Sequence, residues 1–494
     1  MYKDATTEEV NDAMSRSAQA FGIFSKYTAA QRASLMRTIA KEIEQLGDEL
    51  IAVTMRETNL PEARLKGERG RTVFQLNSYA DACERGDWLE ARITTAIPDK
   101  VPARPDIRKM LVPLGPVVVF GSSNFPYAYS TAGGDTATAL AAGCTVVVKA
   151  HPAHPETSSM VAGAVQKALL QLGMPQDIFI HLNGTSFTVG EALVKNQQTA
   201  AVGFTGSFSG GMALFNWANE RKHPIPVFAE MGSVNPVFLF PEKLESDPSG
   251  IAQQYADSIT LGVGQFCTNP GILVGLVSPA LDTFMQLLGE KLSQVRVGKM
   301  LHDGIAANYR KKSEFILEQD GVACLTTRTS ENAEDTPDPV LTAVTGETFL
   351  NNPVLQEEVF GPFSMIVQCK DKAEMASVAA ALDGQLTSTL MATEDDYAAH
   401  ASIIDVIASK CGRIIINGVP TGVEVCQAMH HGGPFPSTTD SRFTSVGSDA
   451  IKRFARPLSF QNYPDKLLPA ALQNANPLGI IRHVNDLPSA QPLA

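Results

Sequence analysis

The sequence VVVFGSSNFPYAYSTAGGDTATALAAGCTVVVKA, residues 117–150, gives the clearest indication of the fold class. Two apolar runs, 117–121 and 145–150, are each typical of a buried strand. Between them, residues 130–142 are rich in small side chains, which suits a helix packed closely on a sheet. A strand, a helix and a second strand in this order predict a crossover connection within a parallel sheet.

The same alternation continues towards the C-terminus. Further helices are predicted at 156–172, 189–195 and 211–219, and further strands at 178–182, 200–204 and 227–229. Right-handed crossovers then predict a doubly wound, Rossmann-like domain. A second αβ region, from about Pro241 to about Pro436, has predicted strands at 363–368, 389–392 and 413–417. The first hundred residues are predicted to be mainly helical, with one helix at 28–46.

Composition and charge limit the function classes. The 494 residues exceed what one core holds, so two or more domains are expected. The net charge of −12 disfavours nucleic acid and anionic membranes as partners. The acidic N-terminus does not resemble a signal peptide, and the longest apolar runs are too short for a membrane span. Seven cysteines without a CxxC pair predict reduced thiols in the cytoplasm, all but one of them buried.

A glycine-rich loop follows one of the predicted strands. The GxGxxG fingerprint of dinucleotide-binding proteins is absent, and Gly206-Ser-Phe-Ser-Gly210-Gly211 is its nearest counterpart. Small residues and free N–H groups at a helix start can hold a pyrophosphate. Because glycine after a strand is more often only a turn, this loop is a weak signal by itself.

Three motifs carry a family resemblance: Ser-Ser-Asn124-Phe-Pro, Phe-Ala-Glu230-Met-Gly and Gly-Gln-Phe-Cys267-Thr-Asn-Pro-Gly. At these residues the chain resembles the aldehyde dehydrogenase superfamily. The resemblance implies a Rossmann-like parallel-sheet cofactor domain, an α/β catalytic domain and an oligomerisation arm. Expected boundaries are 1–237 for the cofactor domain, with a hairpin near 93–112, then 238–437 for the catalytic domain and 438–494 for a return segment and tail.

Two further stretches resemble one branch of that superfamily, the α-ketoglutarate semialdehyde (2,5-dioxovalerate) dehydrogenases. They are Lys149-Ala-His-Pro-Ala-His-Pro, and Asn417-Gly-Val-Pro-Thr-Gly-Val-Glu-Val followed by His431-Gly-Gly-Pro. The branch implies oxidation of 2,5-dioxopentanoate to 2-oxoglutarate. A medium- or long-chain fatty aldehyde remains an alternative substrate. A cysteine acyltransferase or thioesterase is a remote alternative, since no histidine lies near Cys267 in the sequence, and intact motifs argue against a mere binding protein.

The resemblance assigns catalytic roles that chemistry explains. Cys267 would add to the aldehyde as a thiolate, giving a tetrahedral adduct that can expel hydride to a nicotinamide. The oxyanion would be stabilised by the Asn124 amide and the Cys267 backbone N–H. Glu230 would activate water to hydrolyse the thioester, and its apolar surroundings predict a raised pKa.

The cofactor-binding residues expected by resemblance are Lys149, His151, Gly206, Ser207, Gly210, Glu358 and Phe360. Many relatives have Lys-Pro-Ser-Glu where this chain has Lys149-Ala-His151-Pro152, so the glutamate that repels a 2′-phosphate is missing. NADP is therefore slightly favoured over NAD, with Lys149 and either His151 or His154 as phosphate partners.

Other departures concern charged residues. A lysine of some relatives is replaced by Asp135, which puts a proton relay through lysine in doubt. The pair His430-His431 is expected at the substrate mouth, and no metal site is expected. A homodimer or homotetramer is expected, because the 93–109 region and the C-terminal tail resemble the places where relatives form subunit contacts.

Overall fold

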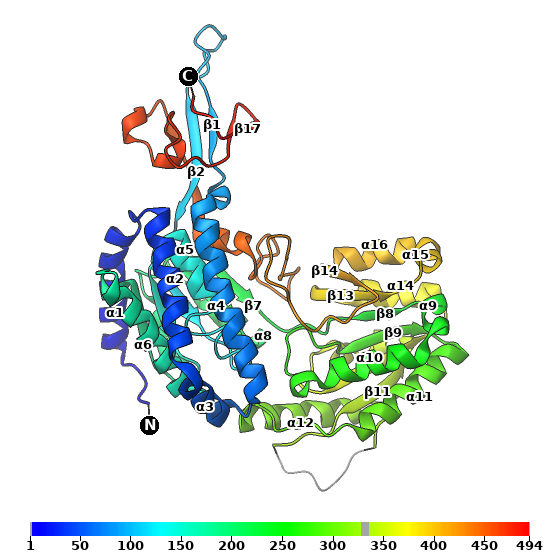
Figure 1. Cartoon of the computed structure of the whole chain (residues 1–494). Coiled ribbons are helices and arrows are strands. Elements are labelled where there is room, and N and C mark those ends of the chain that lie inside the picture. Colours follow the sequence, from blue (N-terminus) through cyan, green and yellow to red (C-terminus); the bar gives the residue numbers. More distant parts are fainter. Residues whose placement is uncertain (1, 328–334, 494) are drawn as a thin grey trace.

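The computed structural model describes residues 2–327 and 335–493, which form two lobes and a projecting arm (Figure 1). The first lobe is built on a sheet in the order β5-β4-β3-β6-β7. Its strands are β3 (Val117–Phe120), β4 (Val146–Lys149), β5 (Phe179–Leu182), β6 (Ala201–Thr205) and β7 (Val227–Glu230). All neighbours are parallel, which confirms the predicted Rossmann-like sheet. The order changes direction between β3 and β6, where open α/β sheets bind ligands.

Helices cover this sheet on both faces, and their small or apolar residues pack against the buried strands. They are α1 (Thr7–Phe24), α2 (Ala29–Gln45), α3 (Gly47–Thr58), α4 (Glu62–Arg85), α5 (Gly134–Ala142), α6 (Pro155–Gln171), α7 (Phe187–Lys195) and α8 (Phe208–Asn219). Helix α5 begins four residues later than the predicted 130–142. Residues 121–133 instead fold into turns, with Ser122 N–H donating to Tyr129 O, and Gly133 in extended conformation begins the helix.

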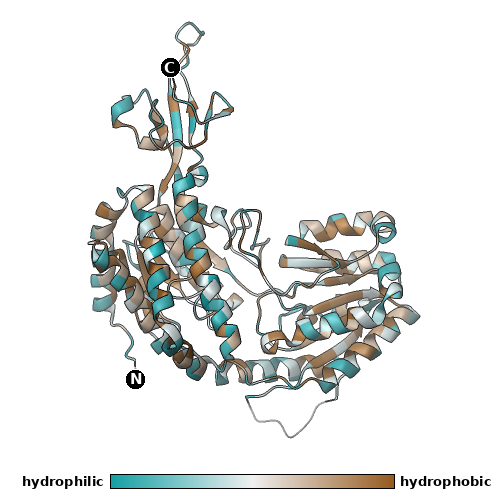
Figure 2. Ribbon diagram, viewed as in Figure 1, coloured by the Kyte–Doolittle hydropathy of each residue, from teal (hydrophilic) through white to brown (hydrophobic). Residues whose placement is uncertain are grey.

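The second lobe contains a seven-stranded sheet in the order β10-β11-β12-β9-β8-β13-β14. Its strands are β8 (Val237–Leu239), β9 (Ile272–Leu276), β10 (Ala323–Cys324), β11 (Val340–Thr345), β12 (Phe363–Cys369), β13 (Gln385–Met391) and β14 (Cys411–Ile416). Its helices are α9 (Pro241–Ser246), α10 (Pro248–Thr260), α11 (Pro279–Gln294), α12 (Asp303–Leu317), α13 (Gly346–Asn351), α14 (Lys372–Ala381), α15 (Glu394–Ala399) and α16 (Ala401–Ser409). In both lobes the strands are largely hydrophobic, while the outer helices expose hydrophilic residues (Figure 2).

The arm is a third sheet, which joins distant parts of the chain in the order β15-β2-β1-β16-β17. Its strands are β1 (Arg92–Thr94), β2 (Ile107–Pro113), β15 (Ala455–Gln461), β16 (Arg482–Val484) and β17 (Leu487–Ser489). Short 3-10 helices complete the chain: η1 (Asp87–Leu89), η2 (Gln176–Ile178), η3 (Leu261–Gly264), η4 (Pro353–Gln356), η5 (Ser448–Phe454), η6 (Asp465–Leu467) and η7 (Ala470–Leu472).

Two further expectations concern membrane-spanning helices and the burial of the cysteines. Within residues 2–327 and 335–493, no helix combines the length and the apolar composition that a bilayer span needs. All seven cysteines are free. The expectation that all but one of the cysteines are buried is wrong for three of them. Cys324 and Cys426 are exposed and Cys411 is half-buried, because β10 and β14 are the edge strands of their sheet and Cys426 lies in a loop.

Candidate active site

Four predicted site residues meet at the carboxyl edge of the first sheet. Asn124 follows β3, Lys149 ends β4, Gly206 follows β6 and Glu230 ends β7. Because β3 and β6 flank the point where the strand order reverses, these residues surround the place where this class of sheet binds ligands.

Cys267 reaches this edge on a rigid turn of the second lobe. Gly264 has φ +65°, and a Cβ there would lie 2.3 Å from the backbone of Gly361, so only glycine fits. The Asn235 side chain donates hydrogen bonds of 2.9 Å to the carbonyl oxygens of both Cys267 and Asn269. The nucleophile candidate is thus held by its backbone, which leaves the thiol free to react.

Asn124 lies at the same turn, as its expected role requires. Its Nδ2 donates a 3.1 Å hydrogen bond to the carbonyl of Gln265, two residues before Cys267. The carbonyl of Asn124 in turn accepts a 3.4 Å hydrogen bond from Arg64. A side-chain amide donor and the cysteine are therefore brought together across the two lobes.

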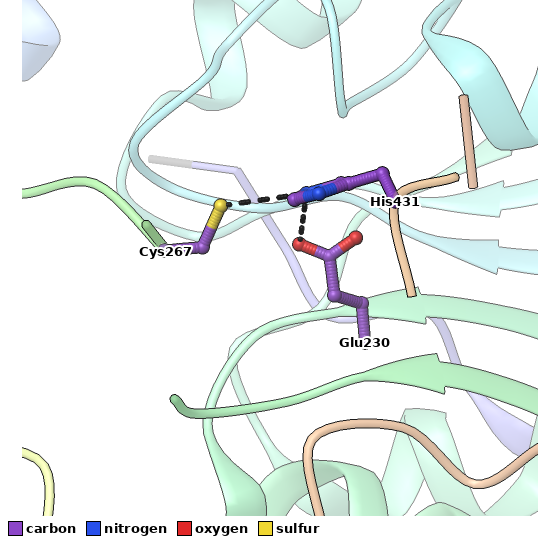
Figure 3. Close-up of side chains that lie close together, drawn as sticks. All are labelled: Glu230, Cys267 and His431. Atoms are coloured by element: carbon purple, nitrogen blue, oxygen red, sulfur yellow. Dashed lines mark hydrogen bonds and ion pairs between the residues drawn. The ribbon is translucent and has the colours of Figure 1, made fainter. Parts of the chain in front are cut away.

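The sulfur of Cys267 lies 3.6 Å from Nε2 of His431, and this nitrogen lies 3.0 Å from Oε1 of Glu230 (Figure 3). The other carboxylate oxygen of Glu230 accepts a 2.8 Å hydrogen bond from Ser445. Glu230 and His431 are 5% and 1% exposed. A thiol, an imidazole and a carboxylate are thus in contact and almost out of water.

His431 is the site residue whose role sequence reasoning missed, and it lies in contact with the sulfur rather than only at a substrate mouth. It stands 164 positions from Cys267, so the argument that no histidine partner is available is wrong. The segment that carries it returns from the second lobe and runs along β7, where Met231 N–H donates to Ser437 O at 2.8 Å. In the sequence, the motif His431-Gly-Gly-Pro was the feature that could have pointed to His431 as a site residue.

The contacts shift the pKa values of the cluster in opposite directions. Burial raises the pKa of the Cys267 thiol well above its usual value, and the Glu230 charge raises it further. Burial alone would also raise the pKa of Glu230, but His431 and the hydrogen bonds to the carboxylate outweigh it and lower the pKa. The expected raised pKa of Glu230 is therefore wrong, because the sequence did not reveal His431 and Ser445.

The loop after β6 offers donors at a helix start. Ser207 caps α8, its hydroxyl accepting a 3.2 Å hydrogen bond from Gly210 N–H. Gly206 N–H donates to Glu230 O at 3.0 Å, which connects this loop to the strand that carries Glu230. Gly206 and Ser207 are exposed, so the helix N-terminus is accessible to an anion such as a pyrophosphate.

Lys149, His151 and His302 gather at the end of β4. Burial lowers the pKa of Lys149, whose ammonium group has no hydrogen bond or ion pair within the described residues. The rings of His151 and His302 are 6.3 Å apart, although His302 comes from the start of α12. Positive charge and ring donors are therefore available here for a ribose or phosphate group.

His154 is not available to a ligand at the end of β4. It has no exposed surface, and its ring nitrogens contact Ser122 O at 2.9 Å and Ser158 Oγ at 3.1 Å. Both nitrogens are thus occupied, so the expectation that His154 serves as an alternative phosphate partner is wrong.

Glu358 and Phe360 line one cavity together with Gly264 and Phe266, next to the Cys267 turn. Burial raises the pKa of Glu358 to about 7. A Cβ on Gly232 would lie 2.6 Å from a carboxylate oxygen of Glu358, so glycine makes room for this side chain. A carboxylate and an aromatic ring in one cavity fit a ribose and a flat heterocycle.

Comparison with known proteins identifies the family. The model of the aldehyde dehydrogenase family matches residues 1–457. The chain belongs to the aldehyde dehydrogenase family. It is 48% identical over 479 residues to alpha-ketoglutaric semialdehyde dehydrogenase 2 of Azospirillum brasilense, covering 97% of this chain and 91% of that one. It is 44% identical over 487 residues to alpha-ketoglutaric semialdehyde dehydrogenase of Acinetobacter baylyi, covering 98% and 92%.

Solved structures share the fold at lower identity. Glyceraldehyde-3-phosphate dehydrogenase of Methanocaldococcus jannaschii, complexed with NADP, matches with a TM-score of 0.77 and 18% identity, covering 93% of this chain and 95% of that one. PnpE of Pseudomonas sp. WBC-3 matches with a TM-score of 0.77 and 21% identity, covering 94% and 92%. The aldehyde dehydrogenase-like α/β fold expected from the sequence is confirmed, and the protein is an enzyme that uses a nicotinamide cofactor.

This aldehyde dehydrogenase uses Asp135, where some relatives have lysine, in a structural ion pair. The carboxylate lies 2.7 Å from the Arg453 guanidinium, with side chains 11% and 5% exposed. A Cβ on Gly203 would approach this carboxylate to 2.8 Å, so β6 leaves space for it. The charge at this position is neutralised rather than available for proton transfer.

Proposed function

We propose that this aldehyde dehydrogenase oxidises α-ketoglutarate semialdehyde (2,5-dioxopentanoate) to 2-oxoglutarate. The observation that carries the proposal is the identity of 44–48%, over nearly the whole chain, to two enzymes named for this substrate. The cluster of Cys267, His431 and Glu230 supports it, because Glu230 ends β7 at the same edge of the sheet as the expected cofactor residues Lys149 and Gly206. Oxidation of a fatty aldehyde by the same chemistry is the alternative.

The first half of the proposed reaction builds an adduct on Cys267. The sulfur adds to the aldehyde carbon while the neighbouring Glu230–His431 pair takes up the thiol proton. The amide of Asn124 and the Cys267 backbone N–H donate to the developing oxyanion. A nicotinamide held beside Glu358 and Phe360 would supply the hydride acceptor, and oxidation of the adduct would leave a thioester on Cys267.

The second half releases the product. The Glu230–His431 pair first releases the thiol proton to solvent. Glu230 then takes a proton from a water molecule, which attacks the thioester carbon, and passes it to the Cys267 sulfur, which leaves as the thiol of the free enzyme while the carboxylic acid product ionises. The lowered pKa of Glu230 keeps it ionised for this role. In sum, aldehyde, water and oxidised cofactor give carboxylate, reduced cofactor and two protons.

We also propose residues for the cofactor. Gly206, Ser207 and Gly210 would hold the pyrophosphate, and Glu358 and Phe360 the nicotinamide ribose and ring. Lys149 and His151 would bind the adenosine ribose. An NADP preference is supported by the unpaired Lys149 and by Pro152, which carries no charge to repel a 2′-phosphate.

Turnover tests this function directly. Cys267→Ser and Glu230→Gln should each abolish reduction of the cofactor, whose absorbance is followed with the semialdehyde and with a series of alkanals. A consistent preference for alkanals would favour the alternative substrate, and acyl transfer without cofactor reduction would favour a thioesterase.

The organisation of the enzyme is proposed as well. We infer a cofactor domain at 1–237, a catalytic domain at 238–437 and a return segment with tail at 438–494. A homodimer or homotetramer is supported by exposed apolar side chains on the arm, among them Leu467, Ile481 and Leu487. The free thiols support a cytoplasmic location. Light scattering of the purified enzyme tests the assembly.

A further inference from the structure

Two arginines near the catalytic cysteine have no negatively charged partner in the part of the chain that the structure describes. Arg71 lies in α4 and Arg413 lies in β14, so they approach from different lobes. In each of them Nε is buried and has no hydrogen-bond partner. Each residue is half-buried, so its guanidinium group has lost part of its hydration without gaining an anion, and this arrangement favours an anionic ligand.

Arg71 is held next to an aromatic ring. Its Nη2 donates a 3.3 Å hydrogen bond to the hydroxyl of Tyr129, and its guanidinium carbon lies 5.7 Å from the centre of that ring. Burial and Glu230 raise the pKa of the Cys267 thiol, whereas the charge of Arg71 lowers it. Arg71 is thus close enough to act electrostatically on the nucleophile.

Arg413 is held by main-chain oxygens instead of a carboxylate. Its Nη2 donates to the carbonyls of Pro420 at 3.0 Å and Gly422 at 3.2 Å, while Nη1 lies 3.9 Å from the Met429 sulfur. Burial lowers the pKa of Arg413, and interactions with Cys267 and Tyr129 oppose this shift. The carbonyls fix the side chain but leave its full positive charge uncompensated.

Both arginines contact the same apolar cluster beside Cys267. Arg71 touches it through Tyr129, Arg413 touches it through Met429, and Phe266 belongs to it and directly precedes Cys267. The cluster consists of Phe125, Ala128, Tyr129, Val425 and Val446, with Phe266, Val423 and Met429 packed against it. This combination offers a short carbon chain an apolar surface and offers a carboxylate two cations.

A neighbouring arginine shows the contrast. The Arg64 guanidinium lies 4.4 Å from the Phe125 ring, on the same cluster, but it forms a 2.7 Å ion pair with Glu68. Its charge is already matched within the protein. The missing partner is therefore a property of Arg71 and Arg413, and not of every cation around these aromatic rings.

We propose that Arg71 and Arg413 bind the distal carboxylate of a short semialdehyde whose aldehyde carbon reaches Cys267. The inference rests on the proposed semialdehyde oxidation and names its specificity-determining residues. Guanidinium groups match the two oxygens of a carboxylate, which a neutral alkanal lacks. An alkanal would leave both charges unpaired, so the site discriminates against it.

The test compares α-ketoglutarate semialdehyde with pentanal, which has the same number of carbons and no carboxylate. Arg71→Met and Arg413→Met should each lower kcat/KM for the semialdehyde about 10- to 100-fold, mainly through KM. Turnover of pentanal should fall much less, because pentanal has no carboxylate for either arginine to bind, and the turnover that remains also reports that each variant is folded. Arg85→Met, an exposed change at the end of α4, is the matched control and should change neither activity.

If both methionine variants keep the wild-type kcat/KM for the semialdehyde, Arg71 and Arg413 do not bind its carboxylate, while the proposed function stands. Wild-type enzyme that prefers pentanal would instead overturn the proposed substrate. If a methionine variant loses activity with both aldehydes, Arg71→Lys and Arg413→Lys test whether the loss is specific to carboxylate binding. Lysine keeps the positive charge but cannot form two parallel hydrogen bonds with a carboxylate, so the proposal predicts a selective rise in KM for the semialdehyde. An equal loss of activity with both aldehydes would overturn the proposal.

Discussion

His431 places one ring nitrogen, Nε2, 3.0 Å from Oε1 of Glu230 and 3.6 Å from the sulfur of Cys267. The pair Glu230–His431 is buried, and Ser445 and Thr444 fix its two members by hydrogen bonds to the carboxylate and to the His431 N–H. One imidazole therefore governs both the protonation of the carboxylate and the surroundings of the thiol.

Replacing His431 should change the pH dependence of the enzyme. In wild type His431 helps to hold the pKa of Glu230 down, so the carboxylate stays ionised on going to acid pH. In His431→Gln burial would dominate and raise that pKa, so the acid limb of the kcat profile should move to higher pH. We expect kcat to fall about 10- to 100-fold, from the loss of a hydrogen bond to a charged group. His430→Gln is the control, and equal profiles in both variants would refute the role of His431.

Cofactor affinity should depend on the ionisation of Glu358. Its pKa is raised to about 7 by burial, so the carboxylate is lost as the pH falls through 7. A protonated carboxyl accepts fewer hydrogen bonds from ribose hydroxyls, and the Kd for the cofactor should rise below pH 7. Fluorescence titration of NADP from pH 5.5 to 8.5 measures this. Glu358→Gln should remove the pH dependence of Kd. The control Glu357→Gln, which changes an exposed neighbour, should keep it. A wild-type Kd that does not change with pH would contradict the prediction.

The buried ion pair between Asp135 and Arg453 should be a stability determinant. Asp135→Ala leaves a buried guanidinium unpaired and should lower the free energy of unfolding by about 3–5 kcal/mol. Arg453→Met should do likewise, whereas the double variant Asp135→Leu with Arg453→Met should lose much less than the two losses together. Urea unfolding measures all three, and strictly additive losses would show that the pair is not coupled.

Zinc should inhibit the enzyme reversibly. Ligand atoms of Glu230, Cys267 and His431 lie within 4.8 Å of one another, and thiolate, imidazole and carboxylate are donors that Zn²⁺ prefers. The sequence predicts no resident metal, and this prediction concerns added Zn²⁺ that displaces the thiol proton. We expect chelation to restore activity and His431→Gln to weaken inhibition. Mg²⁺, which prefers oxygen ligands, is the control, and equal inhibition by both ions would exclude this site.

Local sequence patterns are enough to predict the parallel sheet of the first lobe, because apolar runs of strand length alternate with helical patterns from 117 to 230. The sequence also predicts Cys267, Asn124 and Glu230 as catalytic residues, since each stands in a short motif that needs no knowledge of distant contacts. Local patterns failed at the start of α5, where turns in residues 121–133 replace the first helical turn.

The surroundings of these residues depend on contacts between segments that lie far apart in the sequence. His431 reaches Cys267 across 164 positions, Arg453 pairs with Asp135, and Arg71 and Arg413 approach from separate lobes. The pKa of Glu230 also depends on distant contacts. Its apolar sequence context predicts a raised pKa, but partners from the return segment lower it. Periodicity encodes burial within an element, whereas hydrogen bonds and charge pairing depend on which distant elements pack together.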